Sequence, residues 1–360
     1  MFEMFSATFA HGPTARALSD EAWRDAFIQV EVALAQAAND IGAISGDTTE
    51  AIAEAAKEPF STSDIAASAR RIGNPIAGVL TRFRELIPAE HHDGLHFHTT
   101  SQDILDTAMM LVARNAVDAL RGEIIGAIRS VRNLSSHAGE SEIMARTLLQ
   151  QATPIRVRDL FNTWATGLEQ AHTQLGELEF PVSYSGPVGT HPRHRGKHDI
   201  DYWRLNQCLA LHLDLQPAKD WHTLRYPVVR IASASAEAAG ACGKVATDII
   251  LLSQNEIGEV SEAIGGASTS MPHKHNPVAA TSARANAART PGLLSTLYAA
   301  MPQELQRSSG LWHSEWESLS DLLRLTGSSA TWLGESVRGL QVHPEAMQHN
   351  VNRLHREDTP

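Results

Sequence analysis

The stretch that decides the fold is Pro227–Ile264, which reads PVVRIASASAEAAGACGKVATDIILLSQNEIGEVSEAI. It opens with proline, which suits the first turn of a helix, and Gly265-Gly266 after it is a favoured helix stop. Alanine, serine and glycine lie on almost every face of its middle part, and only such small side chains let neighbouring helices approach closely. The sequence therefore predicts one long helix over 227–264, surrounded by other helices.

Other segments show helical periodicity as well, and strand patterns are scarce. Between Ser19 and Gly42 apolar residues recur at offsets of three and four, with Ser19 as the expected N-cap and Gly42 as the expected stop. The segment from Ser101 to His137 runs for 37 residues without proline. No heptad repeat persists, so the chain is predicted to be all-α, a bundle of long helices. Further helices are predicted over 155–179, 277–297 and 315–337.

The expected domain organisation has three parts: a small N-terminal helical domain over 1–98, a long central bundle over 99–340 and a short C-terminal remnant over 341–360. Irregular segments separate the predicted helices, and in helical bundles such segments and the helix ends usually carry the chemistry. The irregular segments span 91–102, 146–154, 184–198 and 265–277.

Composition narrows the range of partners. The 360 residues are 42% hydrophobic and 20% charged, the balance of a soluble globular protein. Thirty Lys and Arg against 41 Asp and Glu give a net charge of −11, which argues against nucleic acid and anionic membranes as partners because both need basic surfaces. A small anionic substrate remains possible, since a local pocket can oppose the average charge.

Several features predict a cytoplasmic protein. Cys208 and Cys242 match neither a disulfide framework nor a zinc site, and the first residues lack the pattern of a signal peptide. The apolar runs are too short to span a membrane. The histidines of HPRHRGKH, residues 191–198, are interleaved with Arg and Lys and have no nearby carboxylate, so no metal site is expected.

The segment Gly265–Val278, GGASTSMPHKHNPV, resembles the signature loop of the fumarase/aspartase superfamily, and residues 265–277 are called the signature loop below. Two further blocks resemble motifs of that family in the same order: HFHTTSQDILDT at 96–107 and ARTLLQQATP at 145–154. The blocks WHTLRYPVVR at 221–230 and LWHSEW at 311–316 are similar to its cycloisomerase and adenylosuccinate lyase branches.

The resemblance implies an all-α fold and a reaction at the carbon beta to a carboxylate, with neither a metal nor an organic cofactor. Ser268 matches the family's catalytic serine, and Lys274 and Asn276 match residues that stabilise the carboxylate and order the loop. It also implies a small polycarboxylate substrate and a homotetramer whose active sites are shared between subunits. The residues expected to bind substrate are Arg16, His96, Thr100, Ser101, Gln102, Thr147, Gln150 and Met271.

Two departures from the fumarase and adenylosuccinate lyase pattern favour one branch of the family. Where those enzymes carry a catalytic histidine and a glutamate that pairs with it, this chain has Leu148 and Thr281. A second acid is dispensable when the leaving or attacking group is a carboxylate, whose conjugate acid has a pKa of about 4, whereas the far more basic hydroxide must be protonated as it leaves. The expected reaction is therefore lactonisation of 3-carboxy-cis,cis-muconate in aromatic catabolism, with Ser268 as the proton donor.

Alternatives remain open at this point. The chain could be an adenylosuccinate- or argininosuccinate-type lyase, which the absent histidine and glutamate disfavour, or a catalytically silent structural relative, which Ser268, Lys274 and Asn276 disfavour. Gln151 stands where the cycloisomerase branch commonly carries histidine, which leaves fine specificity open. The substituent at carbon 3 could be a carboxylate or another anion such as sulfonate, and the small C-terminal domain of the family is expected to be missing.

Overall fold

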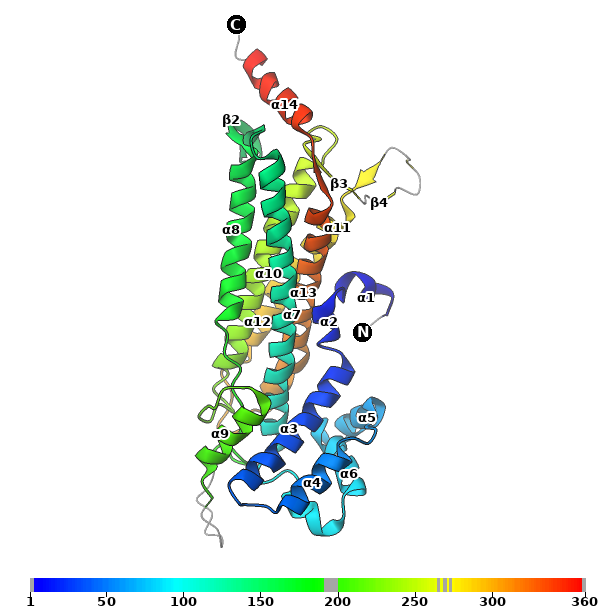
Figure 1. Cartoon of the computed structure of the whole chain (residues 1–360), viewed down its shortest axis with the longest axis vertical. Helices are drawn as coiled ribbons and strands as arrows, with labels where there is room; N and C mark the ends of the chain where they lie inside the picture. Colours follow the sequence, from blue (N-terminus) through cyan, green and yellow to red (C-terminus); the bar gives the residue numbers. More distant parts are fainter. Residues whose placement is uncertain (1–2, 191–199, 264–265, 268–270, 272–273, 358–360) are drawn as a thin grey trace.

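The computed structural model describes residues 3–190, 200–263, 266–267, 271 and 274–357. Helices dominate, so the all-α prediction is confirmed (Figure 1). The helices are α1 (Glu3–Phe9), α2 (Pro13–Arg16), α3 (Asp20–Asp40), α4 (Gly46–Ala55), α5 (Thr62–Ile72), α6 (Ile76–Leu86), α7 (Ser101–Ala138), α8 (Val157–Gly176), α9 (Tyr202–Leu213), α10 (Tyr226–Leu252), α11 (Val278–Ala287), α12 (Thr290–Ala299), α13 (Leu311–Arg338) and α14 (Pro344–Glu357).

Short antiparallel pairs accompany the helices. The strands are β1 (Glu142–Thr147), β2 (Gln150–Arg156), β3 (Val260–Glu262), β4 (Gly266–Ala267), β5 (His275–Asn276) and β6 (Leu340–Val342), and a 3-10 helix, η1, spans Ala89–Gly94. β1 pairs with β2, β3 with β6, and β4 with β5. Each pair therefore fastens a loop or a helix end and is no part of a larger sheet within the described chain.

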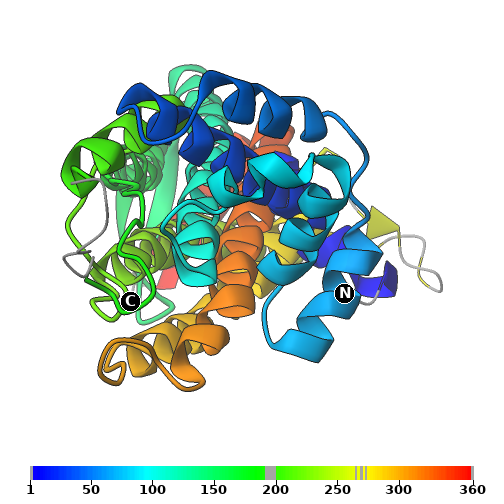
Figure 2. The same cartoon turned by 90° about the horizontal axis from the view of Figure 1, so that it is seen from below.

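The long helices α7, α8, α10 and α13 run side by side and form the bundle (Figures 1 and 2). α7 contacts both α13 and α8, while α10 contacts α8, α11 and α13. Small buried residues of α10, such as Ala232, Ala238 and Ala246, let these helices approach closely, as the sequence predicts. The core is one continuous cluster of aliphatic and aromatic side chains along the bundle.

Local signals set several helix boundaries as predicted. The hydroxyl of Ser19 accepts a hydrogen bond from the backbone N–H of Ala22 at 3.2 Å and caps α3. Thr100 caps α7 in a capping box with Asp103, in which each side chain binds the other residue's backbone N–H. α7 then continues for 38 residues.

Two predicted helix spans are wrong. The helix over 227–264 ends at Leu252, because the chain turns at Gly258 with φ of 61° and then pairs as β3 with β6. The predicted helix over 277–297 is two helices, α11 and α12, since Pro291 lacks the N–H that a continuous helix needs. Helical periodicity alone marks neither break.

The terminal segments lie in different places. α3 to α6 gather at one end of the bundle, whereas α1 and α2 lie along it and contact α13 (Figure 1). At the other end α14 contacts β1. The division into domains over 1–98, 99–340 and 341–360 stays a prediction.

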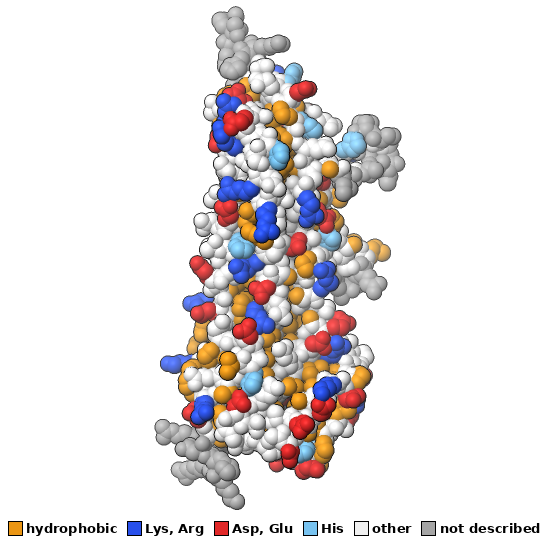
Figure 3. Space-filling view, in the orientation of Figure 1, with side chains coloured by type: hydrophobic (Ala, Val, Ile, Leu, Met, Phe, Trp, Pro, Cys, Tyr) orange, Lys and Arg blue, Asp and Glu red, His pale blue; other side chains and the backbone are white. Residues whose placement is uncertain are grey.

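The visible surface carries acidic and basic side chains intermingled, with hydrophobic side chains between them (Figure 3). Among the described residues, no helix is both long and apolar enough to cross a membrane. Those same residues include no cluster of three or more His, Cys, Asp or Glu side chains that could hold a metal ion. Residues 191–199, which include every histidine of HPRHRGKH, lie outside the described part of the chain.

Candidate active site

His96 begins the first motif block, and a buried carboxylate holds it in place. Glu31 of α3 accepts hydrogen bonds from the backbone N–H of His96 at 3.2 Å and from its ring Nδ1 at 2.7 Å. His96 and His98 have φ of 57° and 50°, in the left-handed region that residues other than glycine seldom adopt. Glu31 therefore fixes a strained loop and leaves Nε2 of His96 as the ring nitrogen for an external partner.

Thr100 and Ser101 lie at the N-terminus of α7, as expected for residues that bind a carboxylate. Arg307, in the segment before α13, donates from Nη2 to the hydroxyl of Thr100 at 2.6 Å and to the carbonyl of Pro187 at 3.3 Å. Arg307 as a whole residue is exposed. Arg307 therefore brings a positive charge to the predicted substrate-binding residues, and the sequence analysis missed it.

Asp103 is the centre of a buried hydrogen-bond network directly beneath Thr100. It accepts from Nε2 of His222 at 2.7 Å and from Thr99, Thr100, Ser183, Ser185 and Gly186. Burial alone would raise the pKa of Asp103, but the hydrogen bond and charge of His222 and the N–H of Ser185 outweigh it and lower that pKa. Nδ1 of His222 is buried and has no partner among the described residues.

Arg225 lies in a second buried group, where one guanidinium serves two carboxylates. It binds Asp106 through both Nη atoms at 2.8 and 3.0 Å, and Glu315 through Nε and Nη2 at 3.0 and 2.6 Å. Burial raises the pKa of Glu315 to about 7, and Arg225 offsets only part of that effect. Trp312 donates to Asp106 at 2.9 Å, which completes the shell.

Three of the blocks that resemble the family meet in these two groups. Asp103 and Asp106 come from the first motif block, His222 and Arg225 from WHTLRYPVVR, and Glu315 from LWHSEW. Gln102 links the two groups: it is fully buried, and its amide donates to Asp106 at 3.3 Å and to the carbonyl of His222 at 2.9 Å. The side chain thus faces the protein interior, and a substrate contact by Gln102 stays a prediction.

The second motif block forms the β1–β2 hairpin, where an irregular segment was expected. Thr147 pairs with Gln150, and both are exposed beside the two-residue turn. That turn consists of Leu148 and Leu149, with φ of 51° and 64° and exposed fractions of 96% and 68%. Turns with positive φ at both positions usually consist of Asn-Gly. Any other residue type in this conformation carries a strain of about 1–3 kcal/mol. The tip is therefore a strained, apolar and exposed feature.

A buried ion pair fastens the hairpin to the bundle. Arg146 donates to both oxygens of Glu259, at 2.9 and 2.8 Å, and the Glu259 side chain is fully buried. The amide of Asn350 in α14 donates to the same carboxylate at 2.9 Å. The hairpin, α14 and the chain after α10 are thus held at one point.

The signature loop is described at both its ends. Gly266 and Ala267 pair with Asn276 and His275, and the amide of Asn276 donates to the carbonyl of Gly266 at 3.4 Å. Lys274 is exposed, and its backbone N–H donates to the carbonyl of Met271 at 3.1 Å. Ser268 lies outside the described residues.

The predicted site residues lie in places too far apart to meet in one chain. At about 1.5 Å per residue, the 38 residues of α7 put Thr100 and the β1–β2 hairpin about 57 Å apart. Figure 1 shows the hairpin at one end of the bundle and the start of α7 at the other, with β4 projecting from the side. Arg16 ends α2 and is exposed on the bundle. One small substrate cannot touch both motif blocks of the same chain.

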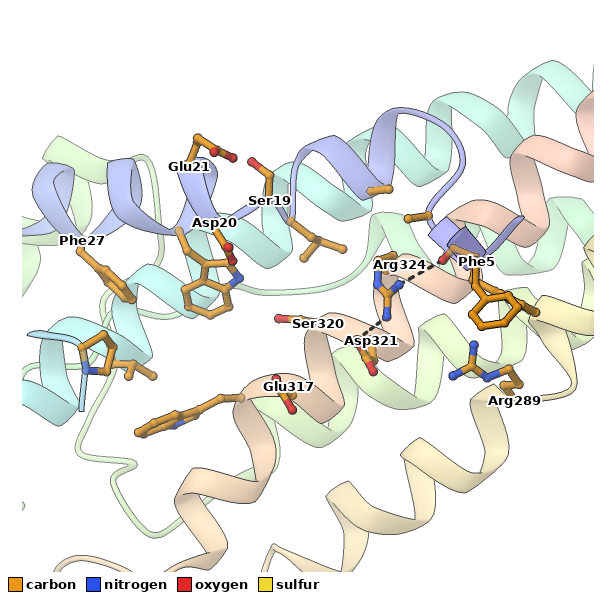
Figure 4. Close-up of a pocket in the computed structure, with 18 residues that line it drawn as sticks. Phe5, Ser19, Asp20, Glu21, Phe27, Arg289, Glu317, Ser320, Asp321 and Arg324 are labelled. Carbon is orange, nitrogen blue, oxygen red and sulfur yellow. Dashed lines mark hydrogen bonds and ion pairs between the residues drawn. The ribbon is translucent and has the colours of Figure 1, made fainter. Parts of the chain in front are cut away.

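A cavity of about 830 Å³ in the described part of the chain lies elsewhere (Figure 4). No predicted site residue is among the described residues that line it. Arg289 and Arg324 lie at one end of the cavity, and Phe27, Glu21 and Asp20 at the other. Its carboxylates, Asp20, Glu21, Glu317 and Asp321, make it a poor site for a polycarboxylate.

A family model described as lyase matches residues 7–292 of the chain. The chain belongs to this lyase family of the fumarase/aspartase superfamily. The resemblance read from the signature loop is thereby confirmed. The buried hydrogen-bond network of Asp103 and His222 therefore holds the first motif block of a lyase-family protein in place.

Similar proteins carry more than one activity in their names. A nitrosuccinate lyase from Streptomyces davaonensis is 34% identical and covers 97% of this chain and 77% of its own. A 3-carboxy-cis,cis-muconate cycloisomerase from Bradyrhizobium diazoefficiens is 34% identical and covers 94% and 77%. The crystal structure of a 3-carboxy-cis,cis-muconate lactonizing enzyme from Pseudomonas putida aligns with a TM-score of 0.90 at 32% identity, covering 97% and 79%.

Sequence reasoning missed the partners of the lyase motifs. Glu31, His222 and Arg307 lie 65, 119 and 207 residues from the groups that they bind. The resemblance of WHTLRYPVVR and LWHSEW to family blocks was the available signal for the buried groups. For Arg307, a lone arginine in the polar segment QELQRSSG, the sequence offered none.

Proposed function

We propose that this chain is a cycloisomerase that lactonises 3-carboxy-cis,cis-muconate, or a 3-substituted analogue, without a cofactor. One carboxylate oxygen of the diene forms a C–O bond to a ring-closing carbon, and the electrons of the double bond pass to the carbon next to another carboxylate. That carbanion, held as its aci-carboxylate, takes the proton of the Ser268 hydroxyl. The product is an isomer of the substrate, and the serine regains its proton from water.

The observation that carries the proposal is the joint replacement of the family's histidine and glutamate. Leu148 occupies the tip of the β1–β2 hairpin and Thr281 lies in α11, so neither position offers an acid or base near neutral pH. Lactonisation needs none, because the attacking group is a carboxylate of the substrate itself. The cycloisomerase names of several relatives support the same reaction.

The charged and polar residues suit a substrate with three carboxylates. Lys274 and Asn276 would stabilise the carboxylate that becomes the aci-carboxylate, where each donor contributes about 10²–10³-fold. Arg307 and Thr100 would bind a second carboxylate, with Ser101 and Nε2 of His96 nearby. Arg307 presents a planar guanidinium, which matches a carboxylate with two parallel hydrogen bonds. Thr147, Gln150, Met271 and Arg16 complete the proposed binding set.

The proposed enzyme works as a homotetramer in the cytoplasm, within aromatic catabolism. Support for the assembly comes from the separation of about 57 Å between Thr100 and the hairpin, which makes a one-chain site impossible. In a tetramer the hairpin of one subunit and the start of α7 of another can share a substrate. Burial of Leu148 and Leu149 in such an interface would also offset the strain of their turn.

A second candidate is elimination of nitrite from nitrosuccinate. Nitrite, like a carboxylate, is a weakly basic anion and leaves without a proton, so the absent histidine and glutamate are compatible with this reaction too. The nitrosuccinate lyase among the relatives supports it with the same 34% identity. An adenylosuccinate- or argininosuccinate-type reaction is less suited, because its leaving group is a basic nitrogen.

One experiment separates these functions. Purified protein is given 3-carboxy-cis,cis-muconate, its 3-sulfonate analogue, nitrosuccinate and adenylosuccinate in separate assays that contain chelator. Loss of diene absorbance with formation of a lactone supports the proposal, while nitrite release supports the second candidate. Turnover of adenylosuccinate alone would contradict both, and no turnover of any substrate would favour a catalytically silent relative. Abolition of activity by chelator would contradict the cofactor-free mechanism.

A further inference from the structure

Glu262 is the last residue of β3, three positions before the signature loop begins, on a strand held firmly in place. It pairs with Leu340 of β6, and the N–H of Ala263 donates to the carbonyl of Gly339 at 2.9 Å. The hydroxyl of Ser261 lies 2.8 Å from Nε2 of His343. The chain that enters the loop is therefore fixed to the C-terminal end of α13.

The same carboxylate binds the helix that begins where the loop ends. The N–H of Ala279 donates to Oε2 of Glu262 at 3.1 Å, and the N–H of Ala280 donates to Oε1 at 2.8 Å. These are amides of the first turn of α11, which the residue at the N-cap usually binds. Pro277 stands at that N-cap, and its side chain has no acceptor. Glu262 takes over the capping role from 17 and 18 residues away.

Packing against α10 and α13 fixes the body of α11, where Ala280 and Ala283 are fully buried, and Glu262 fixes its first turn. A cavity of about 280 Å³ and another of about 500 Å³ are each lined in part by Glu262. Beside the second cavity the base of the loop is narrow, since a Cβ on Gly266 would lie 2.2 Å from a methyl group of Val278. With open space beside the carboxylate, the two hydrogen bonds of Glu262 link the first turn of α11 directly to β3.

We infer that Glu262 is a positioning residue for the reaction: it ties α11 to β3 and so sets where Lys274 and Asn276 stand. The inference rests on the proposed function of those two residues. Glu262 acts through α11, because both of its carboxylate oxygens bind amides of that helix. A misplacement of about 1 Å at a reacting group can cost about 10²-fold in rate, so the tie has a measurable kinetic effect.

A serine at the N-cap separates positioning from simple capping. In Glu262→Ala combined with Pro277→Ser, the new hydroxyl can bind the amides of Ala279 and Ala280 but makes no connection to β3. Pro277→Ser alone is the matched control. We expect the double variant to match this control in thermal midpoint and to fall about 10- to 100-fold below it in kcat, with a smaller change in KM.

Hydrogen exchange provides a readout that does not need a substrate. In the double variant the amides of Ala279 and Ala280 should stay as protected as in Pro277→Ser, while those of His275 and Asn276 in β5 should exchange faster. Equal kcat and equal exchange in the double variant and the control would show that Glu262 is a helix cap and nothing more. If the wild type turns over no substrate, the proposed function fails, and the exchange at β5 alone decides the inference.

Discussion

Replacing Glu315 by glutamine should flatten the pH dependence of stability. Asp106 and Glu315 share the single guanidinium of Arg225, and burial raises the pKa of Glu315 from 4.5 to about 7. The folded state therefore binds this proton more tightly than the unfolded state. The stabilising contribution is complete below pH 4.5 and is lost as the pH rises toward 7.

The size of the effect follows from the two pKa values. Their difference, 7 − 4.5 = 2.5 pH units, corresponds to about 3 kcal/mol at about 1.4 kcal/mol per unit. Glutamine does not titrate, so the variant lacks this loss. Gln303 already donates to Glu315 at 2.9 Å, and its buried Oε1 has no partner among the described residues, so it can accept from the new amide.

The measurement is urea unfolding of wild type and Glu315→Gln at one protein concentration, followed by tryptophan fluorescence at pH 5, 6, 7 and 8. Comparison at each pH cancels the titration of all other groups. The variant should gain up to about 3 kcal/mol relative to wild type as the pH rises to 8, with most of the gain between pH 5 and 7. A difference between the two proteins that stays constant over this range would refute the raised pKa of Glu315.

Three further predictions concern the proposed site. Ser268→Ala should lower kcat by about 10²–10⁴-fold with an unchanged circular dichroism spectrum, because the proton donor is lost; near-normal turnover would disprove its role. Mixing inactive Ser268→Ala with inactive Thr147→Ala after joint dissociation and reassembly should restore part of the activity, since some shared sites regain both residues; a mixture as inactive as its parts would argue against shared sites. Arg307→Met should raise KM at least about tenfold and Arg307→Lys less, because only the guanidinium forms two parallel hydrogen bonds; unchanged KM in both would remove Arg307 from the substrate site.

The sequence predicts those features whose causes are local. The cap at Ser19 and the start of α7 at Ser101 depend on residues within one helical turn, and both are confirmed. The end of α10 at Leu252 was missed, because it depends on pairing of β3 with a strand about 80 residues later. The buried hydrogen-bonded groups were not predicted for the same reason, because Asp106 binds Arg225 and Trp312, which lie 119 and 206 residues away in the sequence.

For the candidate site, the motif blocks could be located from the sequence, but not their arrangement. Thr100 and Thr147 are 47 positions apart, and the long helix that the pattern of 101–137 predicts holds them at opposite ends of the bundle. Arg307 reaches Thr100 only through the fold, so no local pattern could name it. The roles of all these residues stay predictions.

The short span from Glu259 to Glu262 has a consequence for how this chain can change over evolutionary time. Glu259 holds the hairpin through Arg146, and Glu262 holds α11. Side chains alternate between the faces of a strand, so one inserted or deleted residue in this span would turn Glu262 away from α11. The hairpin and α11 would then no longer be held by the same short span. The spacing between the two glutamates therefore matters as well as their identity.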